Sequence, residues 1–378
     1  MSRRVVVRAG LASCALALAV LVPSCATTGA AGEGDLNLPT TGVGPFRKLS
    51  VDEVPGIAPF VLDDRTAVYR EPAVLAPESG GDGVILYAVG RQGASDVIVR
   101  TRSDDGRSFF GSSGDFGKTP RVVLSATLPW EGGAVAGPFV LRVNAEVLLF
   151  YAAEGGIGLA RSTDGGLVFR KEPAPVLTRD AASPWESTQV RAPSVFLLPD
   201  GRLRMLYAAG VSIGEAESVD GVRFQRVDPD PTTPVLEPVL QPAAPAEAPA
   251  EAGSLLPNER GPFDTALVGD PCVVTRVTPD SRFHVRVLYT GIAATGASAI
   301  GFAGRYGDTG LLVRNVAPVY SVGAKEAAPA LLEVPGGSYL YVQQNRRVDE
   351  RLTYTAIAAA FAPGSVKLRT PLPFPDSP

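Results

Sequence analysis

The stretch Arg191-Ala192-Pro193-Ser194-Val195-Phe196 is one of five copies of a short apolar phrase built around a proline. The other copies are centred on Pro72, Pro138, Pro271 and Pro329. After a turn, each phrase is followed by a second apolar run that carries a tyrosine, at Tyr87, Tyr151, Tyr207, Tyr289 and Tyr341. Successive prolines lie 55 to 78 residues apart, somewhat above the roughly 40–50 residues of well-known propeller repeats. The chain is therefore a repeat protein whose unit is larger than one strand.

Composition and turns identify the unit as β-structure. Runs such as 146–151, 204–209 and 286–290 are dense in β-branched, aromatic and leucine residues, which is typical of strands. Three units add a Ser-x-Asp-Gly sequence, which we interpret as a structural turn because Ser and Asp side chains bond the turn's own amides. The sequence predicts an all-β fold, a five-bladed β-propeller of four-stranded antiparallel blades over residues 46–378.

Residues 238–257 interrupt the repeats. This segment is rich in Pro and Ala and contains few residues that could pack in a core. We interpret it as a low-complexity loop between units three and four rather than as a domain boundary, because the repeat resumes directly afterwards at Phe263-Asp264.

Residues 1–25 are expected to form a signal peptide. Three arginines precede an apolar run of 14 residues, 9–22, which is shorter than the ~20 residues that span a bilayer. The segment Val22-Pro23-Ser24-Cys25 resembles the end of a bacterial lipoprotein signal, and the resemblance implies lipidation of Cys25. The alternative is a plain secretory signal cleaved nearby. Residues 26–45, rich in Gly, Thr and Ala, would form a flexible tether. We therefore expect a lipid-anchored protein of the bacterial cell envelope, at the outer membrane given Ala26.

Charge and rare residues argue against several other classes. The formal net charge of −4 becomes about −7 once the three signal arginines are removed, so nucleic acid is not an expected partner. With Cys14 removed and Cys25 lipidated, Cys272 is the remaining thiol and no disulfide is expected. Because His284 is the single histidine, neither a Ser-His-Asp hydrolase nor a His-rich metal site is expected. We expect no metal, no cofactor, a monomer, and membrane contact through the lipid alone.

An aromatic residue followed by an acid precedes three of the repeat prolines, always with seven residues from acid to proline. The pairs are Trp130-Glu131, Trp185-Glu186 and Phe263-Asp264. Because inner strands line the channel of a propeller, such acids could converge on one pocket. Carboxylates bond sugar hydroxyls and flat rings cover the apolar face of a sugar, so the pattern favours carbohydrate. The alternative is that the aromatic rings pack between blades and the acids cap turns.

With these pairs, the third and fourth units resemble blades of the five-bladed propeller glycosidases related to arabinanases, levansucrases and invertases. The resemblance rests on Trp185-Glu186, the phrase at 191–195, the turns at 200–201 and 218–221, and Phe263-Asp264 with Gly269-Asp270-Pro271. It covers nearly the whole mature chain. It implies an envelope-anchored glycoside hydrolase acting on an oligo- or polysaccharide through paired carboxylates at the channel. The alternative is a non-catalytic carbohydrate-binding or scaffold propeller.

The resemblance also suggests roles for individual residues. Asp270 matches the recurrent Asp-Pro of the family, and Glu71 occupies the same repeat position in the first unit. The predicted catalytic acids are Asp270, Glu71, Glu186 and Asp264; the predicted substrate-binding residues are Trp130, Trp185, Arg70, Arg191, Glu131 and Glu326. The sequence departs from the family at Ala192, where the first and fourth units carry acids, and Asp63 and Asp64 are the nearest residues to the acid expected in the first blade.

Overall fold

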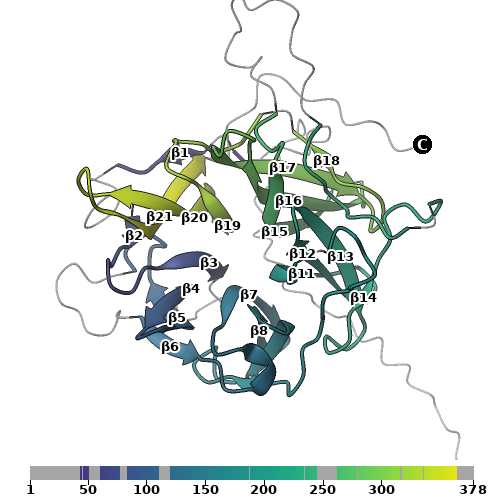
Figure 1. The fold of residues 1–378 in the computed structure, drawn as a ribbon, viewed down its shortest axis with the longest axis horizontal. Coiled ribbons are helices and arrows are strands. Elements are labelled where there is room, and N and C mark those ends of the chain that lie inside the picture. The colour runs from purple at the N-terminus through teal and green to yellow at the C-terminus, as the bar shows by residue number, and fades with distance from the viewer. Residues whose placement is uncertain are drawn as a thin grey trace, which may run out of the picture.

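A computed structural model of the chain is an all-β, five-bladed propeller, as the sequence predicts (Figure 1). The structure describes residues 43–44, 46–50, 60–76, 83–109, 120–186, 188–233, 235–244, 262–278, 280–315, 317–334 and 336–363. The expected signal peptide, Cys25 and most of the expected tether lie outside these residues. Within them, no helix is long and apolar enough to cross a membrane, and the helical structure is a short 3-10 turn, η2 (Pro129–Glu131).

Each blade is one antiparallel sheet, and the strand that carries the repeat proline lies innermost (Figure 1). Blade 1 contains β3 (Arg70–Leu75), β4 (Val84–Gln92), β5 (Ser95–Ser103) and β6 (Arg121–Leu124); blade 2 contains β7 (Ala136–Val143), β8 (Glu146–Ala153), β9 (Gly156–Ser162) and β10 (Arg170–Lys171). Blade 3 contains β11 (Arg191–Leu197), β12 (Leu203–Ala209), β13 (Ser212–Ser218) and β14 (Gln225–Arg226). Blade 4 contains β15 (Leu267–Val277), β16 (Phe283–Ile292), β17 (Ser298–Tyr306) and β18 (Val313–Arg314).

Blade 5 closes the ring by combining both ends of the described chain. It contains β19 (Ala327–Val334), β20 (Gly337–Arg347) and β21 (Thr353–Pro363). Two N-terminal strands, β1 (Arg47–Lys48) and β2 (Phe60–Leu62), both pair antiparallel with β21. Asp63, directly after β2, accepts a hydrogen bond from the Tyr354 hydroxyl at 2.7 Å and pairs with Arg346 of β20. The first and last parts of the domain are thus held in one sheet.

The apolar core is divided among the five blade interfaces. One buried cluster lies between each pair of neighbouring blades, and the five repeat tyrosines are all fully buried in these clusters. The Ser-x-Asp-Gly turns also join blades, because the Tyr341 hydroxyl of blade 5 donates to the Gly106 carbonyl of blade 1 at 2.6 Å. Within that turn the Gly106 N–H donates to Ser103 Oγ at 3.0 Å, which confirms the structural interpretation of these turns.

The first residues of the expected loop 238–257 belong to the fold, which corrects its N-terminal boundary. Val239 and Leu240 are buried in the core between blades 3 and 4. The Ile213 N–H donates to the Leu240 carbonyl at 2.9 Å, and Leu240 N–H donates back. These two apolar side chains pack at the edge of blade 3, although the sequence around them contains few other residues that could pack in a core.

We expect the two halves of this segment to differ in their effect on stability. Leu240→Ala should lower the free energy of unfolding by about 2–5 kcal/mol, because it removes a buried leucine side chain from a packed core. Deleting residues 246–256 should change it little, since loop length enters the closure entropy only logarithmically. Denaturant unfolding of both variants checks this; equal losses would place the deleted segment in the core.

Candidate functional site

A β-bulge in every inner strand shapes the centre of the propeller. The strand register shifts in all five blades, and the residue before each repeat proline has positive φ, between 47° and 54°: Glu71, Gly137, Ala192, Asp270 and Ala328. A residue with a Cβ pays roughly 1–2 kcal/mol to adopt this left-handed conformation. Because the bulge occurs in all five blades, this backbone strain is a feature of the fold. The bulge also determines which residues surround the propeller axis.

These bulges line a narrow central cavity. Its wall contains the five bulge residues and their prolines, together with Ala73, Phe139 and Cys272. The cavity has space of about 40 Å³, more than the roughly 10–15 Å³ that one water molecule needs. Among the residues that the structure describes, the wall is mainly apolar and its charged side chains are those of Glu71 and Asp270. A ligand would reach the cavity at its open edge, here called its mouth.

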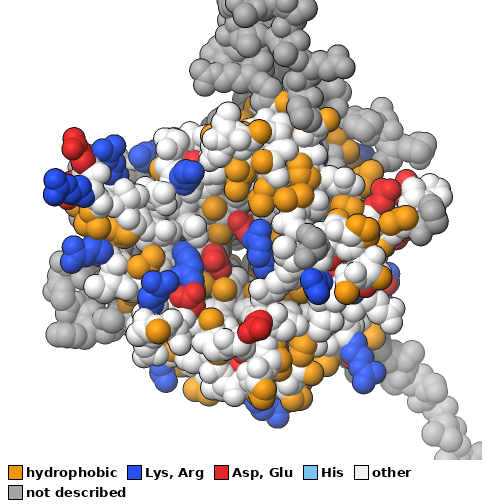
Figure 2. Space-filling view, viewed as in Figure 1, with side chains coloured by type: hydrophobic (Ala, Val, Ile, Leu, Met, Phe, Trp, Pro, Cys, Tyr) orange, Lys and Arg blue, Asp and Glu red, His pale blue; other side chains and the backbone are white. Residues whose placement is uncertain are grey.

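Two arginines accompany the two acids at this mouth. Arg191 Nη1 donates to Asp270 Oδ1 at 2.6 Å, from blade 3 to blade 4. Arg70 Nε lies 3.5 Å from Glu71 Oε1, and its Nη2 pairs with Asp96 of β5. Figure 2 shows basic and acidic side chains gathered around a hollow at the centre of this face. The structure thus brings together four of the residues predicted from the sequence, and adds Asp96, which no motif had indicated.

The environment of Glu71 favours its neutral form. Glu71 lies at the centre of the ring with protein on all sides, although 30% of its side chain remains exposed to the channel. Burial raises the pKa of the Glu71 carboxyl, and the nearby Asp270 adds to this rise. The Arg70 charge and the Gly137 N–H, which donates to Glu71 Oε2 at 2.6 Å, oppose the rise without cancelling it. Asp270 accepts a hydrogen bond from the Arg191 guanidinium.

The acids of the aromatic-acid pairs do not line this cavity. Glu131, Glu186 and Asp264 are each about 1% exposed, and each accepts a hydrogen bond from the tyrosine hydroxyl of its own blade, at 2.7, 2.7 and 2.8 Å. Each also pairs with a base of the outermost strand: Lys171, Arg226 and Arg314. These acids therefore connect the second and outermost strands of blades 2, 3 and 4. A base recurring 40, 40 and 50 residues after the acid was the sequence signal for this arrangement.

Glu131 illustrates the electrostatics of these buried acids. Burial opposes its ionisation, but the Lys171 ammonium and the N–H groups of Leu128 and Thr127 outweigh burial and lower its pKa below the usual value. A carboxylate held ionised by so many donors stabilises the fold rather than exchanging protons with a substrate. This arrangement corresponds to the capping alternative for the acids of the pairs.

The aromatic partners of these acids stack inside their blades. Trp130 stacks on Tyr151 with ring centres 5.9 Å apart, and Trp185 stacks on Tyr207 at 6.1 Å. Phe263 stacks on Tyr289 in the same way. A glycine of the third strand makes the room, since a Cβ on Gly214 would lie 2.3 Å from the Trp185 ring and 2.6 Å from the Tyr207 ring. Neither tryptophan lines the cavity.

The remaining sequence candidates also lie away from the cavity. Glu326 is fully buried, and its Oε1 accepts from the N–H groups of Val322 and Ala324 at 2.8 and 2.9 Å. Lys325 donates instead to the Gly296 carbonyl. Asp63 belongs to the ring closure, and Asp64 caps a turn through the Thr66 N–H. Among the described residues, no group of three or more His, Cys, Asp or Glu side chains could hold a metal ion.

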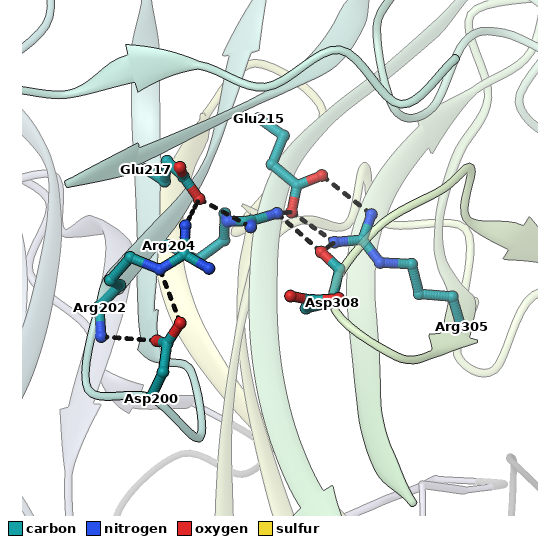
Figure 3. Close-up of polar contacts among 7 residues, drawn as sticks. All are labelled: Asp200, Arg202, Arg204, Glu215, Glu217, Arg305 and Asp308. Carbon is teal, nitrogen blue, oxygen red and sulfur yellow. Dashed lines mark hydrogen bonds and ion pairs between the residues drawn. The ribbon is translucent and has the colours of Figure 1, made fainter. Parts of the chain in front are cut away.

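A second charged cluster is structural. Glu215 of β13 accepts from Arg204 of β12 at 3.0 Å and from Arg305 of β17 at 2.9 Å (Figure 3). Both arginines also donate to the Asp308 carbonyl. All three side chains are at most 4% exposed, so the cluster joins blades 3 and 4 and offers no surface to a ligand.

The fold matches solved glycoside hydrolases at low sequence identity. A glycosyl hydrolase from Bacteroides ovatus has a TM-score of 0.58 at 12% identity, over 89% of this chain and 99% of that chain. A family 117 glycoside hydrolase from Zobellia galactanivorans has a TM-score of 0.56 at 12% identity, over 89% and 94%.

An α-L-arabinofuranosidase from Podospora anserina, solved with cellotriose, has a TM-score of 0.55 at 12% identity, over 86% of this chain and 99% of that chain. No protein-family model matches the chain, and neither does any curated protein. At this identity the comparisons establish a shared fold. The predicted resemblance to five-bladed propeller glycosidases is confirmed at that level.

A substitution in one of the buried pairs should show its structural role. Glu186→Gln should lower the free energy of unfolding by roughly 3 kcal/mol, because it leaves Arg226 and the Tyr207 hydroxyl without their charged partner. Asp104→Asn is the matched control; its carboxylate is 69% exposed, so its loss should cost under about 1 kcal/mol. Chemical denaturation measures both. If Glu186→Gln were as stable as the control, Glu186 would not be structural.

Proposed function

We propose that this chain is a glycoside hydrolase-like protein of the bacterial envelope, which acts on a glycan at the channel mouth through Glu71 and Asp270. The observation that carries the proposal is the placement of these two carboxylates. They come from blades 1 and 4, occupy the same bulge position and line one cavity. The fold shared with solved glycoside hydrolases supports this class, although a fold alone does not select a chemistry.

The two acids have environments suited to different tasks. Glycoside hydrolysis requires one carboxylic acid that protonates the leaving oxygen and one carboxylate that acts on the opposite side of the oxocarbenium-like transition state. Burial favours the protonated form of Glu71, which suits the general acid. Asp270, held by Arg191 at 2.6 Å, is the second carboxylate, acting as base, nucleophile or electrostatic stabiliser.

A non-catalytic carbohydrate-binding propeller is the second candidate. It is favoured by one specific observation: the other three bulge positions carry Gly137, Ala192 and Ala328, so within the described residues no third carboxylate lines the cavity. In this case the same mouth would bind a glycan without cleaving it.

The enzyme proposal predicts loss of turnover without loss of folding. Glu71→Gln and Asp270→Asn should each lower hydrolysis at least about a hundredfold, the lower end of the contribution of a general acid or base, while thermal unfolding remains cooperative. The assay is a screen of aryl glycosides and of envelope and plant polysaccharides. Glu350→Gln, an exposed acid outside the cavity wall, is the control and should remain active. Binding without turnover in the wild type would select the non-catalytic candidate.

The pH dependence gives a separate readout on Glu71. Activity should fall as pH rises through the raised pKa of Glu71, because the acid form is consumed. The same shift affects folding: the stability contributed by protonated Glu71 is complete below its ordinary value of 4.5 and is lost as pH rises through the raised value. The wild type should therefore lose thermal stability relative to Glu71→Gln over this interval, and parallel curves would contradict the shifted pKa.

The envelope location rests on the N-terminal sequence. The apolar run that ends at Cys25 supports a lipidated N-terminus, and several acyl chains would give stable attachment where one chain gives marginal binding. Cys25→Ala should move the protein from the membrane fraction to the soluble fraction or leave the precursor unprocessed. Fractionation and mass spectrometry of the N-terminus measure this, with Cys14→Ala as the control. An unchanged membrane fraction for Cys25→Ala would rule lipidation out.

A further inference from the structure

The two arginines at the cavity mouth differ in how fully their donors are used. Arg70 pairs with Asp96, lies 3.5 Å from Glu71, and its side chain is 17% exposed. Arg191 makes a hydrogen bond to Asp270, and 38% of its side chain is exposed. In the part of the chain that the structure describes, this bond through Nη1 is the only hydrogen bond of the Arg191 guanidinium. Arg191 therefore retains unused donors beside the proposed catalytic acids.

The Arg191 guanidinium lies close to a glycine of the neighbouring blade. Its Nη2 would lie 3.3 Å from a Cβ added to Gly269, the residue before Asp270. The guanidinium thus extends from β11 of blade 3 over β15 of blade 4, where a larger side chain would crowd it. Because Nη1 of the guanidinium is bonded to Asp270, the positive charge of Arg191 is held at the mouth, where a ligand would meet it.

The charged side chains around the mouth are compatible with an anionic ligand. Arg70, Arg91 and Arg191 face Glu71, Asp96 and Asp270 there. The three arginines equal the three acids in number, so any protonation of Glu71, whose pKa is raised by burial, leaves the mouth with net positive charge. A planar guanidinium matches a planar carboxylate through paired N–H donors.

We infer that the glycan is acidic, and that Arg191 binds the carboxylate of a uronic acid residue seated over the mouth. The inference rests on the proposed function, because it assigns the substrate class of the same site. The exposure of Arg191 supports it, because 38% of this side chain is open to solvent while one of its nitrogens is bonded to Asp270 beside the cavity. Arg191 then acts as a binding residue that determines specificity, in addition to holding Asp270.

The test compares acidic glycans with their neutral counterparts. Oligogalacturonides, alginate oligomers and glucuronic acid-bearing xylan oligomers are each titrated into the full chain, in parallel with the same oligomers after reduction of their carboxyl groups. The acidic form should bind about tenfold to a hundredfold more tightly, the range expected for a hydrogen bond to a charged group, and salt should reduce the difference.

Variants then assign the preference to the residue. Arg191→Gln should remove most of the preference for the acidic oligomer. Arg191→Lys should retain part of it, because the charge stays while the planar donor pair is lost. Arg223 is exposed, so Arg223→Gln controls for the change in net charge. Equal binding of acidic and neutral oligomers would overturn the inference and leave the proposed function standing. A preference that survives in Arg191→Gln would overturn the role of Arg191. Absence of binding and turnover with every glycan would overturn the proposed function itself.

Discussion

A blade of this propeller can bury its two apolar faces only against its two neighbours, and every other feature depends on that constraint. The core is divided into five interface clusters, so no blade is stable alone and the ring must close. Closure is achieved by β1 and β2 pairing with β21. The closed ring then holds five inner strands around one axis, where the bulge before each proline places Glu71 and Asp270 on a common wall.

The same constraint explains why the molecule contains so many acids that are not in the site. The second strand and the outermost strand of one blade are held together by a buried carboxylate that accepts from a tyrosine and a base, as Glu186 does with Tyr207 and Arg226. A buried charge is tolerated when it is paired and hydrogen-bonded. Glu71 differs because it lines the cavity and 30% of its side chain is exposed there, and that placement separates a candidate catalytic acid from a structural one.

The prediction from sequence was most successful where the signal was periodic. Five copies of the proline phrase and five tyrosines were enough to predict the blade count, because a repeat that recurs five times must solve the same packing problem five times. The aromatic-acid pairs were equally periodic, but periodicity could not distinguish structural residues from site residues. Trp185 stacks on Tyr207 inside its blade, whereas Glu71 and Asp270 line the cavity. The loop prediction also placed Val239 and Leu240 outside the core. The surrounding segment is rich in Pro and Ala, so its average composition did not indicate that these two side chains pack.

The sequence by itself determined the all-β class, the five units, the turns and the equivalence of Glu71 and Asp270, because each of these depends on residues close together in the chain. The tertiary structure decided which acids share a cavity and which strand closes the ring. It also decided that Arg191 of blade 3 bonds Asp270 of blade 4, and that Asp96 pairs with Arg70. These contacts join residues of different blades or of different strands within one blade. Their geometry follows from how the ring closes, which no local pattern encodes.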